Sequence, residues 1–160
     1  MPLTIRAITE SDNIELAKII RASLEEFDVP KIGTVYSDPT TDNLSALFQA
    51  KGSAYFIAEE DGQLLGGCGI YPTDGLPEKH AELVKLYLSP ASRGRGIAKH
   101  LLEQTYQVAK ETGYTHLYLE SFPQLESAVS LYLKNGFSHL DQAMGNSGHH
   151  ACTIWMLKEL

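Results

Sequence analysis

The alternation of apolar and polar residues divides much of the chain into short strands. Strands are predicted over residues 3–8, 54–60, 63–71, 80–88 and 115–120, with two more near 137–140 and 152–157. Asp61 and Gly62 lie between the second and third strands, and this pair supplies the positive φ angles of a type I′ turn. These two strands are therefore expected to form an antiparallel hairpin.

Apolar residues that recur at helical spacing predict helices between the strands. The predicted helices follow the capping residue Thr9 and span residues 42–50, 95–112 and 125–134. Gly113 ends the long third helix, and Asn135 with Gly136 ends the fourth. The resulting order, β-α-α-β-β-β-α-β-α-β-β, contains no repeat, linker or low-complexity segment, and it predicts a single α/β (α+β) domain over residues 1–160.

Residues 28–41 have no clear period and contain Pro30, Gly33 and Pro39, which favours an ordered loop over a helix. Residues 71–79 contain two further prolines and are also expected to be loop. Long loops of this kind often carry binding residues.

Composition and charge limit the classes of partner. The chain has 160 residues, of which 43% are hydrophobic and 21% charged, enough for one core. Lys and Arg total 13 against 20 Asp and Glu, and the net charge of −7 disfavours nucleic acid and anionic membranes as partners. The apolar runs fall short of the roughly 18 residues of a membrane span, so a cytoplasmic protein is expected. Cys68 and Cys152 are too few for a disulfide framework and are expected to be buried thiols.

The segment Arg93-Gly94-Arg95-Gly96-Ile97-Ala98 follows a predicted strand and opens a predicted helix. Its glycines let the backbone approach a ligand closely, and the free amides and dipole of the helix start favour an anion. Two arginines would reinforce this cradle. The alternative is an ordinary helix start with solvated arginines. A Walker loop and a dinucleotide-binding fold are excluded, because the Gly-Lys-Ser/Thr run and a repeating βαβ pattern are missing.

A second segment, Ala128-Val129-Ser130-Leu131-Tyr132-Leu133-Lys134-Asn135-Gly136-Phe137, follows in the next predicted helix. The two segments in this order resemble the two motifs of the GNAT family of N-acetyltransferases, and the resemblance covers residues 3–157. It implies a mixed, mostly antiparallel sheet whose fourth and fifth strands splay apart, flanked by helices. The chain departs from the family at Leu125, where many relatives have Asn.

The resemblance implies acetyl-coenzyme A as cosubstrate, with its pyrophosphate on the amides of the cradle and its pantetheine arm along the fourth strand. The residues that it assigns to the coenzyme are Leu86, Tyr87, Leu88, Arg93, Gly94, Arg95, Gly96, Ile97, Ala98 and Lys99. The family needs no metal, and three donors in the run His149-His150-Ala151-Cys152 make a weak metal site.

Tyr132 matches the family position of a tyrosine beside the coenzyme sulfur. A phenol is protonated at neutral pH and can give a proton to the departing thiolate, so the resemblance implies a general acid. Glu120 and Glu82 are the two candidates for the base that deprotonates the amine acceptor. Glu120 ends the fifth strand, twelve residues before Tyr132, as the base does in family members that acetylate protein N-termini. Glu82 is expected to share side-chain parity with Val84, Leu86 and Leu88 on the fourth strand.

Tyr36 in the first long loop and His149 before the last strand are candidates to bind the acceptor, and the alternative for each is a simply exposed side chain. The function expected from the resemblance is direct transfer of an acetyl group to a small-molecule or peptide amine, and it allows a homodimer. Two alternatives stay open: a sensor that binds acyl-coenzyme A without turnover, and an interaction protein that uses an exposed sheet edge.

Overall fold

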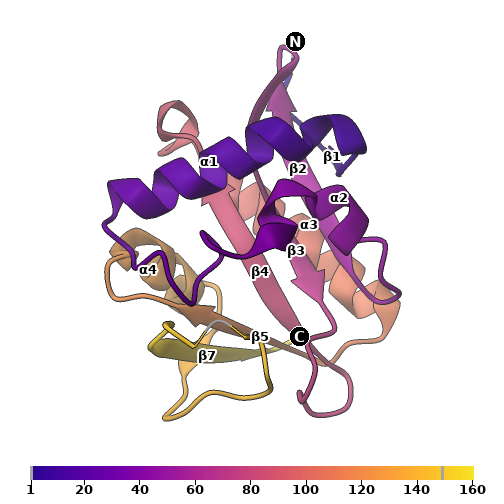
Figure 1. The fold of residues 1–160 in the computed structure, drawn as a ribbon. Coiled ribbons are helices and arrows are strands. Elements are labelled where there is room, and N and C mark those ends of the chain that lie inside the picture. The colour runs from indigo at the N-terminus through magenta and orange to yellow at the C-terminus, as the bar shows by residue number, and fades with distance from the viewer. Residues whose placement is uncertain (1, 149) are drawn as a thin grey trace.

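A seven-stranded sheet with the order β1-β2-β3-β4-β5-β7-β6 forms the centre of the computed structural model, which describes residues 2–148 and 150–160 (Figure 1). The strands are β1 (Thr4–Ala7), β2 (Ala54–Glu60), β3 (Gln63–Tyr71), β4 (His80–Leu88), β5 (His116–Ser121), β6 (Ser138–His139) and β7 (Ile154–Glu159). Every neighbouring pair is antiparallel except β4 and β5, which are parallel. The predicted mixed, mostly antiparallel sheet is confirmed.

Helices cover both faces of this sheet (Figure 1). The α-helices are α1 (Asn13–Glu26), α2 (Leu44–Leu47), α3 (Ile97–Thr112) and α4 (Glu126–Lys134), and short 3-10 turns span Glu10–Asp12, Pro39–Asp42 and Pro90–Ser92. One core cluster packs α1 and α2 on the sheet, and a second packs α3 and α4 on the opposite face. No helix among the described residues is long and apolar enough to cross a membrane.

Local sequence signals explain most of the element boundaries. Asp61 and Gly62 have φ angles of 52° and 76°, as the predicted hairpin turn requires. Gly113, at φ 102°, ends α3 in the left-handed conformation. The short helix expected over residues 42–50 is observed only from Leu44 to Leu47, and a separate 3-10 turn, Pro39–Asp42, precedes it with its first amides capped by the side chain of Asp38.

Strand β4 contains a bulge that the alternation pattern did not predict. The pairing with β3 moves from Gly69↔Val84 to Gly67↔Tyr87, so β4 holds one more residue than β3 at this point. Lys85 lies in the bulge with φ 55°, a left-handed conformation. The extra residue reverses the side-chain parity, so the expectation that Glu82 shares a face with Leu86 and Leu88 is wrong.

The packing confirms this reversal. Val84 packs in the α1 cluster, whereas Leu86 and Leu88 pack in the α3 cluster. Glu82 has the parity of Val84, so it lies on the α1 face of the sheet.

Tyr55, which lies on β2, contacts the bulge of β4. Its hydroxyl donates a 2.6 Å hydrogen bond to the carbonyl oxygen of Lys85. A Cβ atom at Gly67 would lie 2.4 Å from this ring, and one at Gly69 would lie 2.6 Å from it. These two glycines therefore make the space in which Tyr55 reaches the bulge.

Candidate active site

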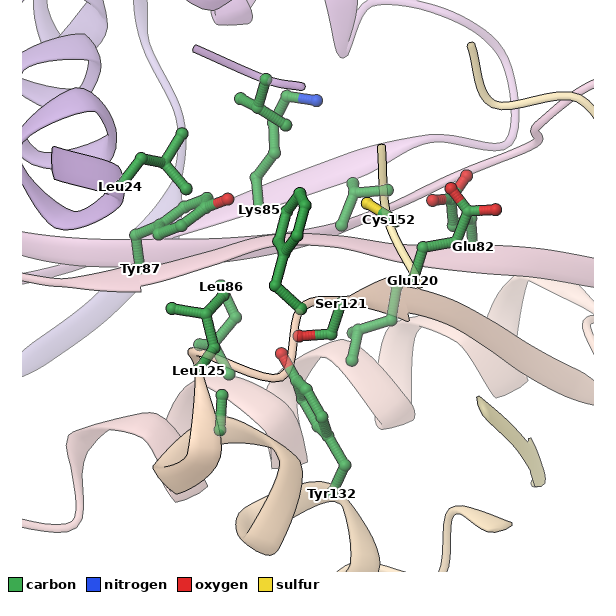
Figure 2. A pocket seen from close by; sticks show the side chains of 15 residues that line it. Leu24, Glu82, Lys85, Leu86, Tyr87, Glu120, Ser121, Leu125, Tyr132 and Cys152 are labelled. Carbon is green, nitrogen blue, oxygen red and sulfur yellow. The ribbon is translucent and has the colours of Figure 1, made fainter. Parts of the chain in front are cut away.

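Strands β4 and β5 separate along their length and leave an opening in the sheet. They pair only from His80 to Glu82 on β4, opposite His116 to Tyr118 on β5. Beyond that point, no strand among the described residues pairs with the β4 edge from Leu83 to Leu88 on the β5 side. A narrow cavity of about 60 Å³ lies in the opening, lined by both strands, α1 and α4 (Figure 2). The predicted splay of the fourth and fifth strands is therefore present.

The loop that follows β4 presents free backbone amides to open space. Gly94 and Gly96 have φ angles of 75° and 76°, and a Cβ atom added to either would meet nothing within 4 Å. The amides of residues 94–99 have no hydrogen-bond partner among the described residues, and α3 begins at Ile97. Buried Ser92 anchors the loop by donating to the carbonyl of Ser89 at 2.7 Å. This arrangement fits a bound phosphate group.

The two arginines of the loop do not face this cradle. Arg93 donates to the Glu26 carboxylate at 2.6 Å and lies 5.1 Å from the ring centre of Phe27. Arg95 donates to the Glu60 carboxylate at 2.7 Å. The expectation that their guanidinium groups reinforce the cradle is thus not met in this structure, where backbone amides form the cradle.

Tyr132 projects from α4 into the opening from the α3 face of the sheet. Its side chain is buried, and Figure 2 shows its hydroxyl pointing toward Ser121. Burial raises the pKa of this phenol well above its usual value, so the group stays protonated. Leu125, the residue before α4, also lines the cavity and makes no side-chain cap for that helix. At the position where the resemblance leads to an expected Asn, this chain therefore offers an apolar contact.

Glu82 and Glu120 lie side by side on the α1 face of the opening (Figure 2). Glu82 is 5% exposed, and its Oε1 atom accepts a 2.6 Å hydrogen bond from Thr73. Burial raises the pKa of Glu82 to about 7, and the charge of Glu120 acts in the same direction. A carboxyl group with this pKa can take and release a proton near neutral pH.

Both carboxylate oxygens of Glu120 accept hydrogen bonds. Tyr118 donates to one at 2.7 Å, and Ser147 donates to the other at 2.5 Å. The backbone amide of Met144 in turn donates to the Tyr118 hydroxyl at 3.0 Å. Glu120 therefore also holds the loop between β6 and β7 against the sheet.

The acceptor-binding residues expected from the sequence are not both at the cavity. Tyr36 donates a 2.5 Å hydrogen bond to Glu25 on the surface of α1, whereas its neighbour Val35 lines the cavity. Tyr36 therefore does not line this cavity, and its role in acceptor binding stays a prediction. His149 lies outside the described residues.

Sequence reasoning missed Lys85, Thr73 and Cys152. Lys85 and Cys152 line the cavity, and Cys152 is half-buried, in contrast to the fully buried Cys68. Burial raises the pKa of Cys152 to about 12, so this thiol is neutral. No short-range pattern marks these residues, because a bulge and two loops bring them to the site. The described residues contain no group of three or more His, Cys, Asp or Glu that could hold a metal ion.

Comparisons with known proteins agree with this geometry. A model of the acetyltransferase (GNAT) family matches residues 17–137. YjgM of Escherichia coli, described as an uncharacterised N-acetyltransferase, is 38% identical over 157 residues, which cover 98% of this chain and 94% of that protein.

Solved structures share the fold. A GNAT-family acetyltransferase from Staphylococcus aureus superposes with a TM-score of 0.88 at 21% identity, covering 99% of both chains. The PaiA N-acetyltransferase of Thermoplasma acidophilum, solved in complex with coenzyme A, superposes with a TM-score of 0.78 at 23% identity, covering 100% of both chains.

The chain belongs to the acetyltransferase (GNAT) family. It is an acyltransferase enzyme, an N-acetyltransferase of that family, as its two sequence motifs predicted.

Proposed function

We propose that the protein transfers the acetyl group of acetyl-coenzyme A to the amine of a small molecule or peptide, directly within a ternary complex. One observation carries the proposal: the opening between β4 and β5 joins Tyr132 on one face of the sheet to Glu82 and Glu120 on the other. A thioester and an amine that enter from opposite faces can therefore meet inside the sheet.

The chain has a complementary surface for each part of the coenzyme. The free amides of residues 94–99 suit the pyrophosphate. The β4 edge at residues 86–88 has no partner strand on the β5 side among the described residues and suits the amide groups of the pantetheine arm, with the Leu88 carbonyl held by Arg93 at 3.1 Å. Leu125 and Leu86 supply apolar contacts in the cavity. The complex of PaiA with coenzyme A supports the same cosubstrate for this chain.

The side chains account for every proton in the transfer. Glu82 takes one proton from the ammonium group, which frees the nitrogen lone pair to attack the thioester carbon. A C–N bond forms and the C–S bond breaks. Tyr132 gives its proton to the departing sulfur, and the resulting phenolate takes the remaining excess proton from the nitrogen. The products are the acetylated amine and free coenzyme A.

Glu82 fits the role of base better than Glu120. Its Oε2 atom has no hydrogen-bond partner among the described residues, and its pKa of about 7 lies near the working pH. Glu120 uses both oxygens to bind Tyr118 and Ser147. In this proposal Glu120 attracts the cationic acceptor and helps to keep the pKa of Glu82 high.

The direct test is an acceptor screen that measures coenzyme A thiol release with acetyl-coenzyme A as donor. We expect turnover with at least one amine and an acetylated product detectable by mass spectrometry. Tight binding of acetyl-coenzyme A without acetylation of any amine in a broad screen would favour the sensor alternative.

A further inference from the structure

The acceptor side of the cavity has opposite charges at its two ends. Figure 2 shows Glu82 and Glu120 together on one side, with Lys85 and Tyr87 on the other. All four line the same cavity, and the bulge in β4 places Lys85 and Tyr87 on the same face of the sheet as the two glutamates. A ligand that fills this space meets two carboxylates at one end and two hydrogen-bond donors at the other.

The ammonium group of Lys85 has no hydrogen bond or short ion pair with any described side chain. Burial lowers its pKa, while the charges of Asp38 and Glu82 act against this shift. Asp38 itself accepts hydrogen bonds from the hydroxyl and the amide of Thr40, at 2.8 and 2.9 Å. Lys85 therefore keeps its hydrogen-bond donors available to a ligand, although its ammonium group has already lost much of its water.

Tyr87 adds a second available donor. Its side chain is desolvated, which raises the pKa of the phenol, so the hydroxyl keeps its proton. This hydroxyl has no hydrogen-bond partner among the described residues, and it points toward the side of the cavity from which Lys85 rises (Figure 2). A desolvated ammonium and a desolvated hydroxyl that line one cavity both suit an anionic oxygen of a ligand.

Loops border the cavity through Val35 and Cys152, and backbone hydrogen bonds join these loops to their neighbours. The amide of Ala151 donates to the carbonyl of Gly33 at 3.4 Å, which joins the loop after α1 to the loop before β7. The amide of Asn146 donates to the carbonyl of Asp74 at 2.7 Å, which joins the latter loop to the β3–β4 loop. The narrow cavity and the joined loops beside it favour a small acceptor over a folded protein.

We propose that the acceptor is a small aminocarboxylate such as a free amino acid, with its ammonium at Glu82 and Glu120 and its carboxylate at Lys85 and Tyr87. This inference rests on the proposed function and specifies the substrate class. Leu24, Val35 and Phe122 line the same cavity and offer an apolar wall for the substituent of the amino acid. An amine that lacks the carboxylate would leave the donors of Lys85 and Tyr87 unmatched.

The test compares amino acids with the amines that remain when their carboxylate is removed. Leucine is paired with isoamylamine and phenylalanine with phenethylamine, and kcat/KM is measured for each with saturating acetyl-coenzyme A. We expect the wild-type protein to prefer the amino acid in each pair. Lys85→Met should reduce that preference, the ratio of the two kcat/KM values, by about 10- to 100-fold, the range for loss of a charge-assisted hydrogen bond.

Two further variants distinguish the loss of the Lys85 ammonium group from a loss of folding. Lys85→Gly removes the same ammonium but suits the left-handed φ of 55°, so it should show the same loss of preference in a folded protein. Lys79→Gly is the matched control, because Lys79 is exposed at φ 59° outside the cavity, and its ratio should equal that of the wild type.

Equal or better use of the decarboxylated amines by the wild-type protein would overturn the inference. So would a preference that survives both Lys85→Met and Lys85→Gly, or turnover restricted to peptide amines. The proposed function would stand in each of these cases, since an amine is acetylated. Its own failure is a different result, in which no acceptor of any class releases thiol.

Discussion

The hydroxyl of Thr73 donates a 2.6 Å hydrogen bond to the Oε1 atom of Glu82 from the loop that joins β3 to β4. This bond favours the ionised carboxylate, whereas burial and the nearby charge of Glu120 favour the protonated form. The balance leaves the pKa of Glu82 at about 7. Residues far apart in the chain thus set the proton affinity of the proposed base.

The rate of acetyl transfer should rise with pH through an acidic limb near the pKa of Glu82. Glu82→Gln should remove this limb and lower kcat by roughly 10²- to 10⁴-fold, the usual range for general base catalysis. Thr73→Val should move the limb to higher pH, because the lost hydrogen bond stabilised the carboxylate. Glu120→Gln should move it to lower pH, because a neighbouring negative charge is removed. A pH profile of kcat/KM measures all three effects, and an unchanged limb in Glu82→Gln would assign the base to another group.

The ionised form of Glu82 should also lower the free energy of unfolding at alkaline pH. Its pKa is raised from 4.5 to about 7 on folding, so folding favours the protonated form. This loss of stability is absent below the pKa of Glu82 in the unfolded protein and grows between the two pKa values. Above the pKa in the folded protein it is complete and reaches about 3 kcal/mol. Glu82→Gln should therefore raise the free energy of unfolding more at about pH 8 than at about pH 5. Urea unfolding of this variant beside the exposed control Glu78→Gln checks the sign, and a gain confined to the lower pH would contradict it.

Tyr132→Phe should lower kcat by roughly 10²- to 10⁴-fold and leave the affinity for acetyl-coenzyme A nearly unchanged, because only the proton donor is lost. Tyr106→Phe is a matched control, because the Tyr106 hydroxyl is buried with no hydrogen-bond partner in the part of the chain that the structure describes, and Tyr106 does not line the cavity. Steady-state kinetics and calorimetry separate the two effects. If Tyr132→Phe turned over at the rate of the parent protein, Tyr132 would not be the general acid.

Gly96→Val should abolish measurable binding of acetyl-coenzyme A. The side chain would project into the open space before the free amides, and the φ of 76° disfavours any residue other than glycine. Gly113→Val is matched to it, because Gly113 also has a positive φ and open space, but at the far end of α3. Both variants should lose similar stability, and only Gly96→Val should lose the coenzyme in a calorimetric titration. Equal affinities of the two variants for acetyl-coenzyme A would show that the pyrophosphate binds at another place.

Arg95→Ala should change the affinity for acetyl-coenzyme A by no more than about twofold, because its guanidinium pairs with Glu60 at the surface and exposed pairs contribute little. The dependence of this affinity on salt should likewise be the same in the variant and the parent. Titrations at low and high ionic strength provide the measurement. A large loss of affinity with a flattened salt dependence would show that Arg95 leaves Glu60 to bind the pyrophosphate.

Local patterns in the sequence were enough to predict the elements and the family. The hairpin follows from Asp61 and Gly62, whose backbone conformation depends on neighbouring residues alone, and α3 follows from the spacing of its apolar residues up to Gly113. The two motifs around Gly96 and Tyr132 predicted the family and the enzyme class for the same reason: each motif lies within one loop or one helix. Such features need no information about distant parts of the chain.

Contacts between distant segments decided the geometry and charge of the proposed acceptor site. The bulge at Lys85 depends on Tyr55 of β2 and on the space left by Gly67 and Gly69, so alternation within β4 could not reveal that the parity reverses there. The pairing of Arg93 with Glu26 depends in the same way on how α1 packs against the sheet, and the bond from Tyr36 to Glu25 depends on how the following loop folds back onto α1. A pKa near 7 for Glu82 arises only when folding removes its water and brings Glu120 close, because burial and Coulomb interactions are properties of the assembled chain.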